Sequence, residues 1–187
     1  CRQVKSIKTT VIITTDKCYE NLERKSYSYK EEDKMGGYDI YSSSKGSAEL
    51  VVSSFRRSFK SEYKNCIIST ARAGNVIGGG DWSKDRLIPD IIKSIRSKKS
   101  INIRYPESIR PWQHVVEPLG GYILLAYLSC TNKKKNYGSA WNFGPNKSSC
   151  ISVRDVLMEF KKKYKNKLKF NMPKKKFLHE AKYLSLN

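Results

Sequence analysis

The sequence lacks several features that would assign it to a common class at once. No apolar run approaches the roughly 20 residues of a membrane-spanning helix, and the first residues show no signal-peptide pattern. The five cysteines have no C-x-x-C spacing, and His114 and His179 lie at ligand spacing from neither a cysteine nor each other. We therefore expect a cytoplasmic protein with reduced thiols, no membrane span and no metal.

Acidic residues are also scarce. The chain has 17 Asp and Glu against 37 Lys and Arg, which gives a formal net charge of +20 and would suggest a polyanion such as nucleic acid. Much of the excess lies in lysine runs that are not interleaved with the aromatic side chains expected of single-strand binding, at 133–135, 161–163 and 174–176. We interpret these lysines as a solvated surface and expect no nucleic-acid partner, so a nucleic-acid module is the weakest alternative.

Short β-branched runs separated by a helical pattern predict a parallel sheet. The runs at 10–15 and 66–71 are typical of buried parallel strands, with the first buried on both faces. Apolar residues at helical spacing predict a helix between them, from about Tyr41 to Lys60. The polar, tyrosine-rich segment 18–39 is expected to form a long loop. This order of strand, helix and strand is one βαβ unit.

The remaining residues predict smaller, mixed elements. Asp85 is the expected cap of a helix with an apolar stripe from Leu87 to Ile95, and Pro118 is expected to open an apolar helix that runs through Leu128. The other expected elements are, in order, a strand at 101–104, a loop containing 110–114, a strand at 141–143, and a helix at 153–164 capped by Ser152.

The fold class expected from these elements is α/β. Residues 1–80 are expected to form part of a Rossmann-like doubly wound parallel sheet, and residues 81–187 a smaller mixed α/β substrate-binding region. No strand with a glycine-rich turn precedes Thr10, and Gly78–Gly80 lack the G-x-G-x-x-G spacing. The sequence thus predicts that the glycine-rich half of a dinucleotide-binding domain is missing and that the second region is truncated at its end.

Tyr41 and Lys45 form a Tyr-x-x-x-Lys pair at the start of the first predicted helix. Four residues along a helix place both side chains on one face. A lysine ammonium beside a phenol stabilises the phenolate, which makes the tyrosine a usable base near neutral pH. The spacing alone is common and is also found in surface pairs, so its context decides.

That context is six blocks of sequence in a fixed order. They resemble the NAD-dependent sugar-nucleotide 4,6-dehydratases of the extended short-chain dehydrogenase/reductase family, most closely the members that act on CDP-glucose. The resemblance spans nearly the whole chain and fits the lysine-rich tail least. The blocks lie at 15–21, 36–46, 71–82, 85–90, 109–115 and 141–145.

The resemblance implies a reaction and a set of catalytic residues. The sugar C4 would be oxidised with NAD, water would be eliminated across C5 and C6, and the hydride would return to C6. Tyr41 would be the base held by Lys45, Thr15 would bind the 4-hydroxyl, and Asp16 would protonate the departing C6 hydroxyl. Lys17 would either take the C5 proton or support the site electrostatically. Asp16 could otherwise be an ordinary strand-end aspartate that caps the following loop.

The resemblance also implies binding residues. NAD would contact Tyr41, Lys45 and Arg72, and the substrate CDP-glucose would contact Asn75, Arg86, Arg110 and Trp112. A planar guanidinium suits bidentate contact with a diphosphate. For His114 a structural role in its loop is preferred, because a lone histidine is more often structural.

Three alternatives stay open at this point. The first is another sugar-nucleotide enzyme of the same family, either an epimerase or a GDP-mannose-type dehydratase. The second is an inactive fragment that binds sugar nucleotides. The third, a basic nucleic-acid module, has no groove-reading motif to support it. A homo-oligomer is expected for the full-length protein.

Overall fold

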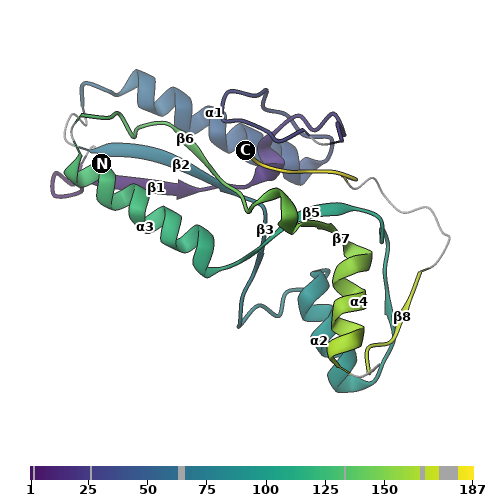
Figure 1. Cartoon of the computed structure of the whole chain (residues 1–187). Helices are drawn as coiled ribbons and strands as arrows, with labels where there is room; N and C mark the ends of the chain where they lie inside the picture. The colour runs from purple at the N-terminus through teal and green to yellow at the C-terminus, as the bar shows by residue number, and fades with distance from the viewer. Residues whose placement is uncertain (2, 26, 63–65, 133, 165–166, 173–180) are drawn as a thin grey trace.

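The computed structural model describes residues 1, 3–25, 27–62, 66–132, 134–164, 167–172 and 181–187 (Figure 1). Lys133, the lysine run at 174–176 and His179 lie outside the described residues.

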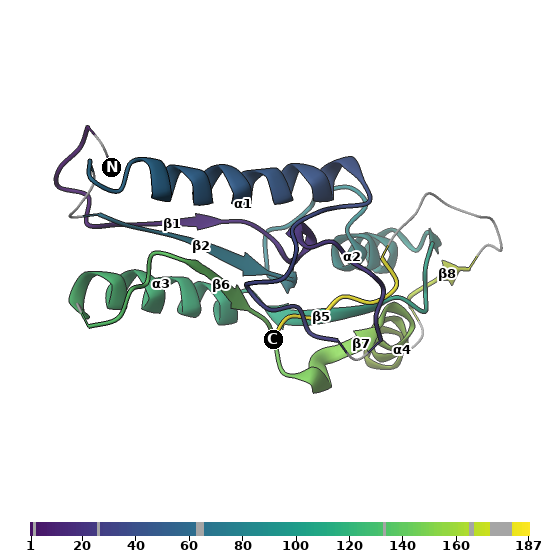
Figure 2. The same cartoon turned by 90° about the horizontal axis from the view of Figure 1, so that it is seen from above.

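The first part of the fold is a parallel sheet with strand order β1-β2-β6, formed by β1 (Thr9–Ile13), β2 (Ile67–Ala73) and β6 (Ala140–Phe143). Helices α1 (Ile40–Ser58) and α3 (Val116–Thr131) lie on opposite faces of this sheet (Figure 2). The predicted βαβ unit and the α/β class are therefore confirmed.

Strand β1 is less buried than its sequence suggests. Its residues are half-buried or exposed, and the side chain of Ile13 is 51% exposed, so the expectation of burial on both faces is wrong for the described chain. The reason is the position of β1 at the edge of the sheet, where it pairs with β2 alone. Central β2, which pairs on both sides, is buried from Ile68 to Ala73.

The second part of the fold is smaller and mixed. Its three-stranded sheet joins β3 (Asn75–Ile77) to β5 (Ile109–His114) in parallel and β5 to β7 (Cys150–Ser152) in antiparallel. Helices α2 (Leu87–Ser97) and α4 (Val153–Lys163) lie beside it, and β4 (Ile101–Asn102) pairs with β8 (Phe170–Asn171). The core of this part contains Ile91, Ile103, Val156, Leu157 and Leu168.

Two sequence expectations in this part are wrong. The segment 110–114 belongs to strand β5 instead of a loop, and Pro111 is tolerated there in a short pairing with Cys150. Asp85 does not cap α2, because it takes a left-handed backbone with φ of 60° and Arg86 occupies the cap position without a side-chain hydrogen bond. Ser152, in contrast, caps α4 as predicted, in a capping box with Asp155.

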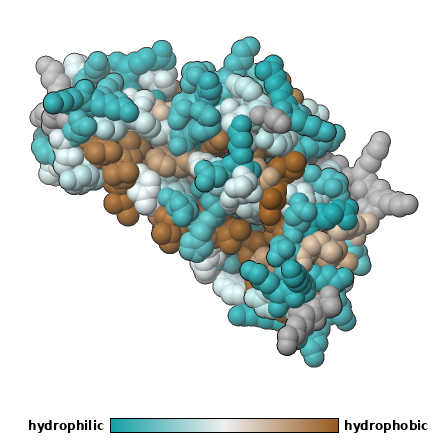
Figure 3. Space-filling model, in the orientation of Figure 1, coloured by the Kyte–Doolittle hydropathy of each residue, from teal (hydrophilic) through white to brown (hydrophobic). Residues whose placement is uncertain are grey.

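Helix α3 begins at Val116, two residues before the predicted Pro118, and carries apolar side chains on more than one face. In Figure 3 apolar side chains gather where α3 lies in Figure 1. The exposed large hydrophobic residues of this helix are Val116, Leu119, Ile123, Leu124 and Tyr127. Among the described residues no helix combines the length and the apolar character that crossing a membrane requires.

Two short 3-10 helices complete the described elements. They are η1 (Asp16–Cys18), directly after the end of β1, and η2 (Lys147–Ser149), before β7. Helix η1 lies at the carboxyl end of the parallel sheet, where such sheets place their ligand sites.

Candidate active site

A cavity of about 1030 Å³ lies where the carboxyl end of the parallel sheet meets the second part of the fold. Side chains from both parts of the chain line it. Eight of the ten predicted site residues are among them, namely Thr15, Asp16, Lys17, Tyr41, Asn75, Arg86, Arg110 and Trp112. A second cavity of about 780 Å³, lined by Cys1, Ile12 and Phe55 among others, includes none of the ten.

Asp16 is the most unusual residue of the larger cavity. Its side chain is 2% exposed, and its Oδ1 accepts a hydrogen bond of 2.9 Å from the hydroxyl of Thr15. Within the part of the chain that the structure describes, its Oδ2 has no hydrogen-bond partner. A buried carboxylate oxygen without a partner is costly, so this atom is placed to meet a ligand or to carry a proton.

The surroundings of Asp16 favour the protonated form. Burial raises the pKa of its carboxyl from 3.8 to about 6, although the hydrogen bond from Thr15 and the charges of Lys17 and Arg110 act in the opposite direction. Gly74 keeps space beside the carboxyl, since a Cβ there would lie 3.0 Å from Oδ2 and 2.6 Å from Pro111 Cγ. The Asp16 carboxyl therefore keeps its proton to a higher pH than an ordinary aspartate does.

Thr15 and Lys17 flank this acid. Thr15 occupies the cap position of η1, where its hydroxyl oxygen accepts a 3.4 Å hydrogen bond from the backbone N–H of Lys17. The local sequence thus turns the chain sharply at the end of β1 and aims three consecutive side chains at the cavity.

Tyr41 lies in the first turn of α1, on the cavity wall, with its side chain 51% exposed. Asp39 caps this helix by accepting hydrogen bonds from the backbone N–H of Ser42 at 2.9 Å and from its hydroxyl at 2.7 Å. The ammonium of Lys45 lies 5.4 Å from the centre of the Tyr41 ring. The predicted pair is therefore a spatial pair on one helix face, although Lys45 itself does not line the cavity.

The predicted substrate residues come from the second part of the fold. Asn75 on β3 is half-buried and pairs in register with Trp112 on β5. The indole N–H of Trp112 donates a 3.1 Å hydrogen bond to the carbonyl of Ile151. Arg110 is 3% exposed and donates to the carbonyl of Ile109 at 3.0 Å, whereas Arg86 is exposed at the start of α2.

Arg72 and His114 differ from the other candidates. Arg72 is 3% exposed, does not line the cavity, and directs its guanidinium at the side chains of Glu49 and Tyr19. Its predicted contact with the cofactor stays a prediction. His114 is exposed, and its Nδ1 accepts a 3.4 Å hydrogen bond from the backbone N–H of Val116, which agrees with a structural role.

A group of buried polar residues behind the cavity was not predicted from the sequence. Glu49, Arg72 and Asn142 lie there, and Tyr19, which also lines the cavity, joins Arg72 to Asn142 through hydrogen bonds. One signal was available for Glu49, which follows Lys45 by four residues and so lies on the same side of α1 as Tyr41 and Lys45.

A parallel α/β sheet, a Tyr-x-x-x-Lys helix and a polar turn after the edge strand, all meeting at one cavity, define the short-chain dehydrogenase/reductase class. The chain resembles sugar-nucleotide enzymes of this class. It is 46% identical over 190 residues to CDP-glucose 4,6-dehydratase from Salmonella typhimurium, a match that covers all of this chain and 52% of the relative.

Solved structures agree with the fold. UDP-glucuronic acid 4-epimerase from Bacillus cereus, in complex with UDP-glucuronic acid and NAD, has a TM-score of 0.81 at 20% identity, over 100% of this chain and 55% of that one. dTDP-glucose 4,6-dehydratase from Bacillus anthracis, in complex with NAD, has a TM-score of 0.73 at 19% identity, over 95% and 52%. The chain spans about half the length of each of these relatives. No family model matches the chain.

Proposed function

We propose that this protein acts in the NAD-dependent dehydration of CDP-glucose to CDP-4-keto-6-deoxyglucose. The observation that carries the proposal is the buried carboxyl of Asp16, whose free Oδ2 lies in the same cavity as the Tyr41 phenol. A base alone is enough to oxidise a sugar hydroxyl, but expulsion of a hydroxyl also needs an acid. The identity to a CDP-glucose 4,6-dehydratase supports the same reaction.

The residues present fit one end of a dinucleotide. The half-exposed phenol of Tyr41 and the ammonium of Lys45 form an accessible pair that can bind ribose hydroxyls and a nicotinamide. A Cβ at Gly79 or Gly80 would meet no atom within 4 Å among the described residues. These two glycines therefore do not form a close backbone cradle of the kind that binds a pyrophosphate. When bound, NAD would supply the hydride acceptor for C4 and the hydride donor for C6.

The side chains divide the remaining steps between them. Tyr41, with the Lys45 ammonium beside its ring, takes the proton of the sugar 4-hydroxyl. The Thr15 hydroxyl, which donates to Asp16 in this structure, can instead donate to the oxygen of the 4-hydroxyl while that hydroxyl gives its proton to Tyr41. Asp16 then transfers a proton to the C6 hydroxyl as it leaves. Lys17 takes the C5 proton or stabilises the charge that develops there.

The diphosphate of the substrate would lie against cationic side chains of the second part of the fold. Arg86 and Arg110 both line the cavity, and a guanidinium can bind two phosphate oxygens at once. Asn75 and Trp112 would contact the sugar or the nucleotide beside them. A cytoplasmic location and a homo-oligomeric state belong to the same proposal.

The competing reaction is 4-epimerisation, because the B. cereus relative of the same fold is an epimerase. At that level of identity the likeness describes the fold alone. The two reactions are separated by their products, because epimerisation conserves the mass of the sugar and dehydration removes one water. The buried acid at Asp16 favours dehydration.

The decisive experiment mixes CDP-glucose and NAD with the chain, and with the chain joined to the part of the Salmonella relative outside the matched region. Product is measured as loss of one water by mass spectrometry. We expect Tyr41→Phe to lower the turnover by about 10²- to 10⁴-fold, since it removes the base. Tyr127→Phe, on the exposed face of α3, is the matched control and should leave turnover unchanged. No water loss in any folded form would reject the proposal.

A further inference from the structure

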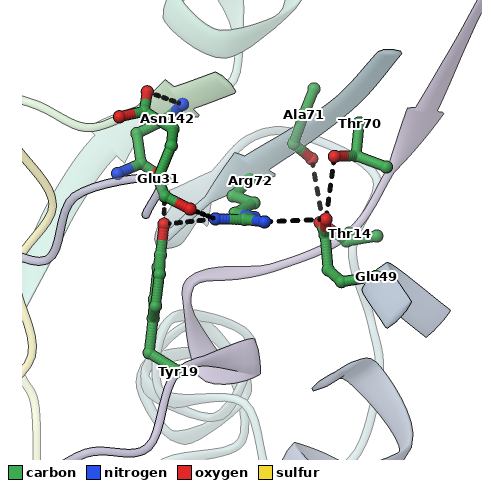
Figure 4. Close-up of polar contacts among 8 residues, drawn as sticks. All are labelled: Thr14, Tyr19, Glu31, Glu49, Thr70, Ala71, Arg72 and Asn142. Atoms are coloured by element: carbon green, nitrogen blue, oxygen red, sulfur yellow. Dashed lines mark hydrogen bonds and ion pairs between the residues drawn. The ribbon is translucent and has the colours of Figure 1, made fainter. Parts of the chain in front are cut away.

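The carboxylate of Glu49 is the centre of a buried polar network behind the cavity. It is 3% exposed and accepts hydrogen bonds from the hydroxyl of Thr14, from the hydroxyl of Thr70 at 2.8 Å, and from Arg72 at 2.8 Å (Figure 4). Three donors, two on β2 and one directly after the end of β1, therefore hold one carboxylate that projects from helix α1. A charge at this depth is stable only because it is paired and fully hydrogen-bonded.

The network continues from Arg72 to the far side of the turn η1. The second terminal nitrogen of Arg72 donates to the Tyr19 hydroxyl at 2.7 Å and to the carbonyl of Glu31 at 3.1 Å. The Tyr19 hydroxyl in turn donates to Oδ1 of Asn142 on β6 at 2.7 Å, and the Arg72 guanidinium lies 5.0 Å from the centre of the Tyr19 ring. Figure 4 shows these contacts as a continuous chain from Glu49 to Asn142.

The network is attached to both ends of the segment that carries the acid. Thr14 immediately precedes Thr15 and Asp16, and Tyr19 immediately follows η1. The same network is attached to the helix that carries the base, because Glu49 lies eight residues after Tyr41 on α1. It therefore spans the two elements whose separation sets the distance between acid and base.

Close packing between helix α1 and the turn η1 also fixes the position of the acid relative to the base. Gly46 lies on α1 between Lys45 and Glu49, and a Cβ there would be 3.2 Å from the carbonyl oxygen of Cys18 in η1 and 3.1 Å from that of Gly36. The helix thus touches the turn through backbone atoms. A shift of η1 relative to α1 would have to break this contact or the hydrogen bonds of the network.

We propose that Glu49, Arg72 and Tyr19 are positioning residues, which hold the Thr15–Asp16 turn at its working distance from Tyr41. The inference rests on the dehydratase function proposed above. Glu49 and Arg72 do not line the cavity, so they act through the turn and the helix that they join. Tyr19 lies at the cavity wall, but it is 1% exposed and its hydroxyl is bound to Arg72 and Asn142. Because a misplacement of about 1 Å can cost on the order of 100-fold in rate, loss of the network should reduce turnover more than substrate binding.

Tyr19→Phe is the mildest test. It deletes the hydroxyl between Arg72 and Asn142 and keeps the ring, which stacks on Tyr29 with centroids 5.1 Å apart. We expect kcat to fall by about 10-fold or more while KM for CDP-glucose stays within about 2-fold. We also expect the Asp16 carboxyl, titrated by carbon NMR in the folded chain, to lose part of its raised pKa as the turn loosens and water reaches it.

Tyr137→Phe is the matched control, since it removes a hydroxyl that accepts a hydrogen bond from Asn132 in another buried part of the same fold. It should change neither kcat nor the titration of Asp16. Glu49→Gln, which keeps the shape of the side chain and removes its charge, should shift both quantities in the same direction as Tyr19→Phe.

The two proposals fail in different ways. If the parent protein is inactive, the dehydratase function is rejected, and the Asp16 titration alone decides the positioning role. If the parent is active and Tyr19→Phe keeps either the parental kcat or the parental Asp16 pKa, the positioning role is overturned.

Discussion

Asp16→Asn is expected to lower the rate of water elimination by about 10²- to 10⁴-fold, the usual contribution of a positioned general acid. The amide has nearly the shape of the carboxyl and can still accept the hydrogen bond from Thr15, so the geometry of the turn should persist. What it cannot do is transfer a proton to the departing hydroxyl. The measurement is the rate of water loss from CDP-glucose with saturating NAD.

The pH dependence of the parent protein follows from the same group. The acid works only when protonated, and burial raises the pKa of Asp16 to about 6. Elimination should therefore be fastest below about pH 6 as far as this group is concerned, and should decline as the pH rises through that value. A rate for Asp16→Asn that equals the parental rate at every pH would show that another group supplies the proton.

The same substitution should stabilise the fold. Because the pKa of Asp16 is 3.8 in an unfolded chain and about 6 in the folded one, the folded state binds the proton more tightly. The contribution of Asp16 to stability is then full below pH 3.8 and is lost as the pH rises toward 6. The loss amounts to about 3 kcal/mol for a side chain that is 2% exposed. Asp16→Asn removes this loss of stability. Part of the gain is offset because the amide nitrogen, in the place of Oδ2, must itself be buried.

Thermal unfolding of the parent protein and of Asp16→Asn at about pH 4 and pH 8 tests whether the substitution stabilises the fold. Asp16→Asn should have the higher Tm at pH 8 and should lose most of that advantage at pH 4. Asp155→Asn is the matched control, because hydrogen bonds from Ser152 hold the pKa of Asp155 below its ordinary value. That exposed carboxylate stabilises the fold above its unfolded pKa, so its replacement should lower Tm at pH 8. A Tm for Asp16→Asn below that of the parent protein at pH 8 would contradict the interpretation that the buried carboxylate of Asp16 destabilises the fold.

The meeting of Asp16 and Tyr41 in one cavity could be predicted from sequence. Both lie at boundaries that a parallel βαβ unit brings to the same edge, one after a strand and the other in the first turn of the next helix. Such boundaries are marked locally, by the end of a β-branched run and by the Asp39 cap. Periodicity thus located both boundaries, whereas the roles of the two side chains came from the resemblance to sugar-nucleotide dehydratases.

The network behind the cavity could not be predicted in the same way. Tyr19 and Asn142 are 123 residues apart, and no local pattern indicates that their side chains meet. Arg72 illustrates the consequence, since an arginine at the end of a buried strand can contact a ligand or a buried carboxylate, and only the packing of α1 on β2 decides between the two. The loop expected at 110–114 was wrong for a related reason, because strand β5 forms only through pairing with residues distant in sequence.

The second large effect is expected from the pair of Arg72 and Glu49. Although burial alone would raise the pKa of Glu49, hydrogen bonds from Arg72, Thr14 and Thr70 hold it below its ordinary value, so the carboxylate is charged in the folded protein. Arg72→Met leaves that charge buried and without its cationic partner. We expect the free energy of unfolding to fall by about 3 to 5 kcal/mol. Urea unfolding, followed by circular dichroism, measures it.

A double-mutant cycle separates the pair from the side chains themselves. If the cost of Arg72→Met comes mainly from an uncompensated charge, then Glu49→Gln in the same chain should restore part of the stability. Arg154→Met is the matched control, since the ion pair of Arg154 with Glu107 lies on the surface, with side chains 46% and 72% exposed, and its loss should cost at most about 1 kcal/mol. A double variant as unstable as the sum of the single variants would mean that the two charges contribute independently, and the coupling between helix α1 and strand β2 would then have to come from the hydroxyls of Thr14 and Thr70.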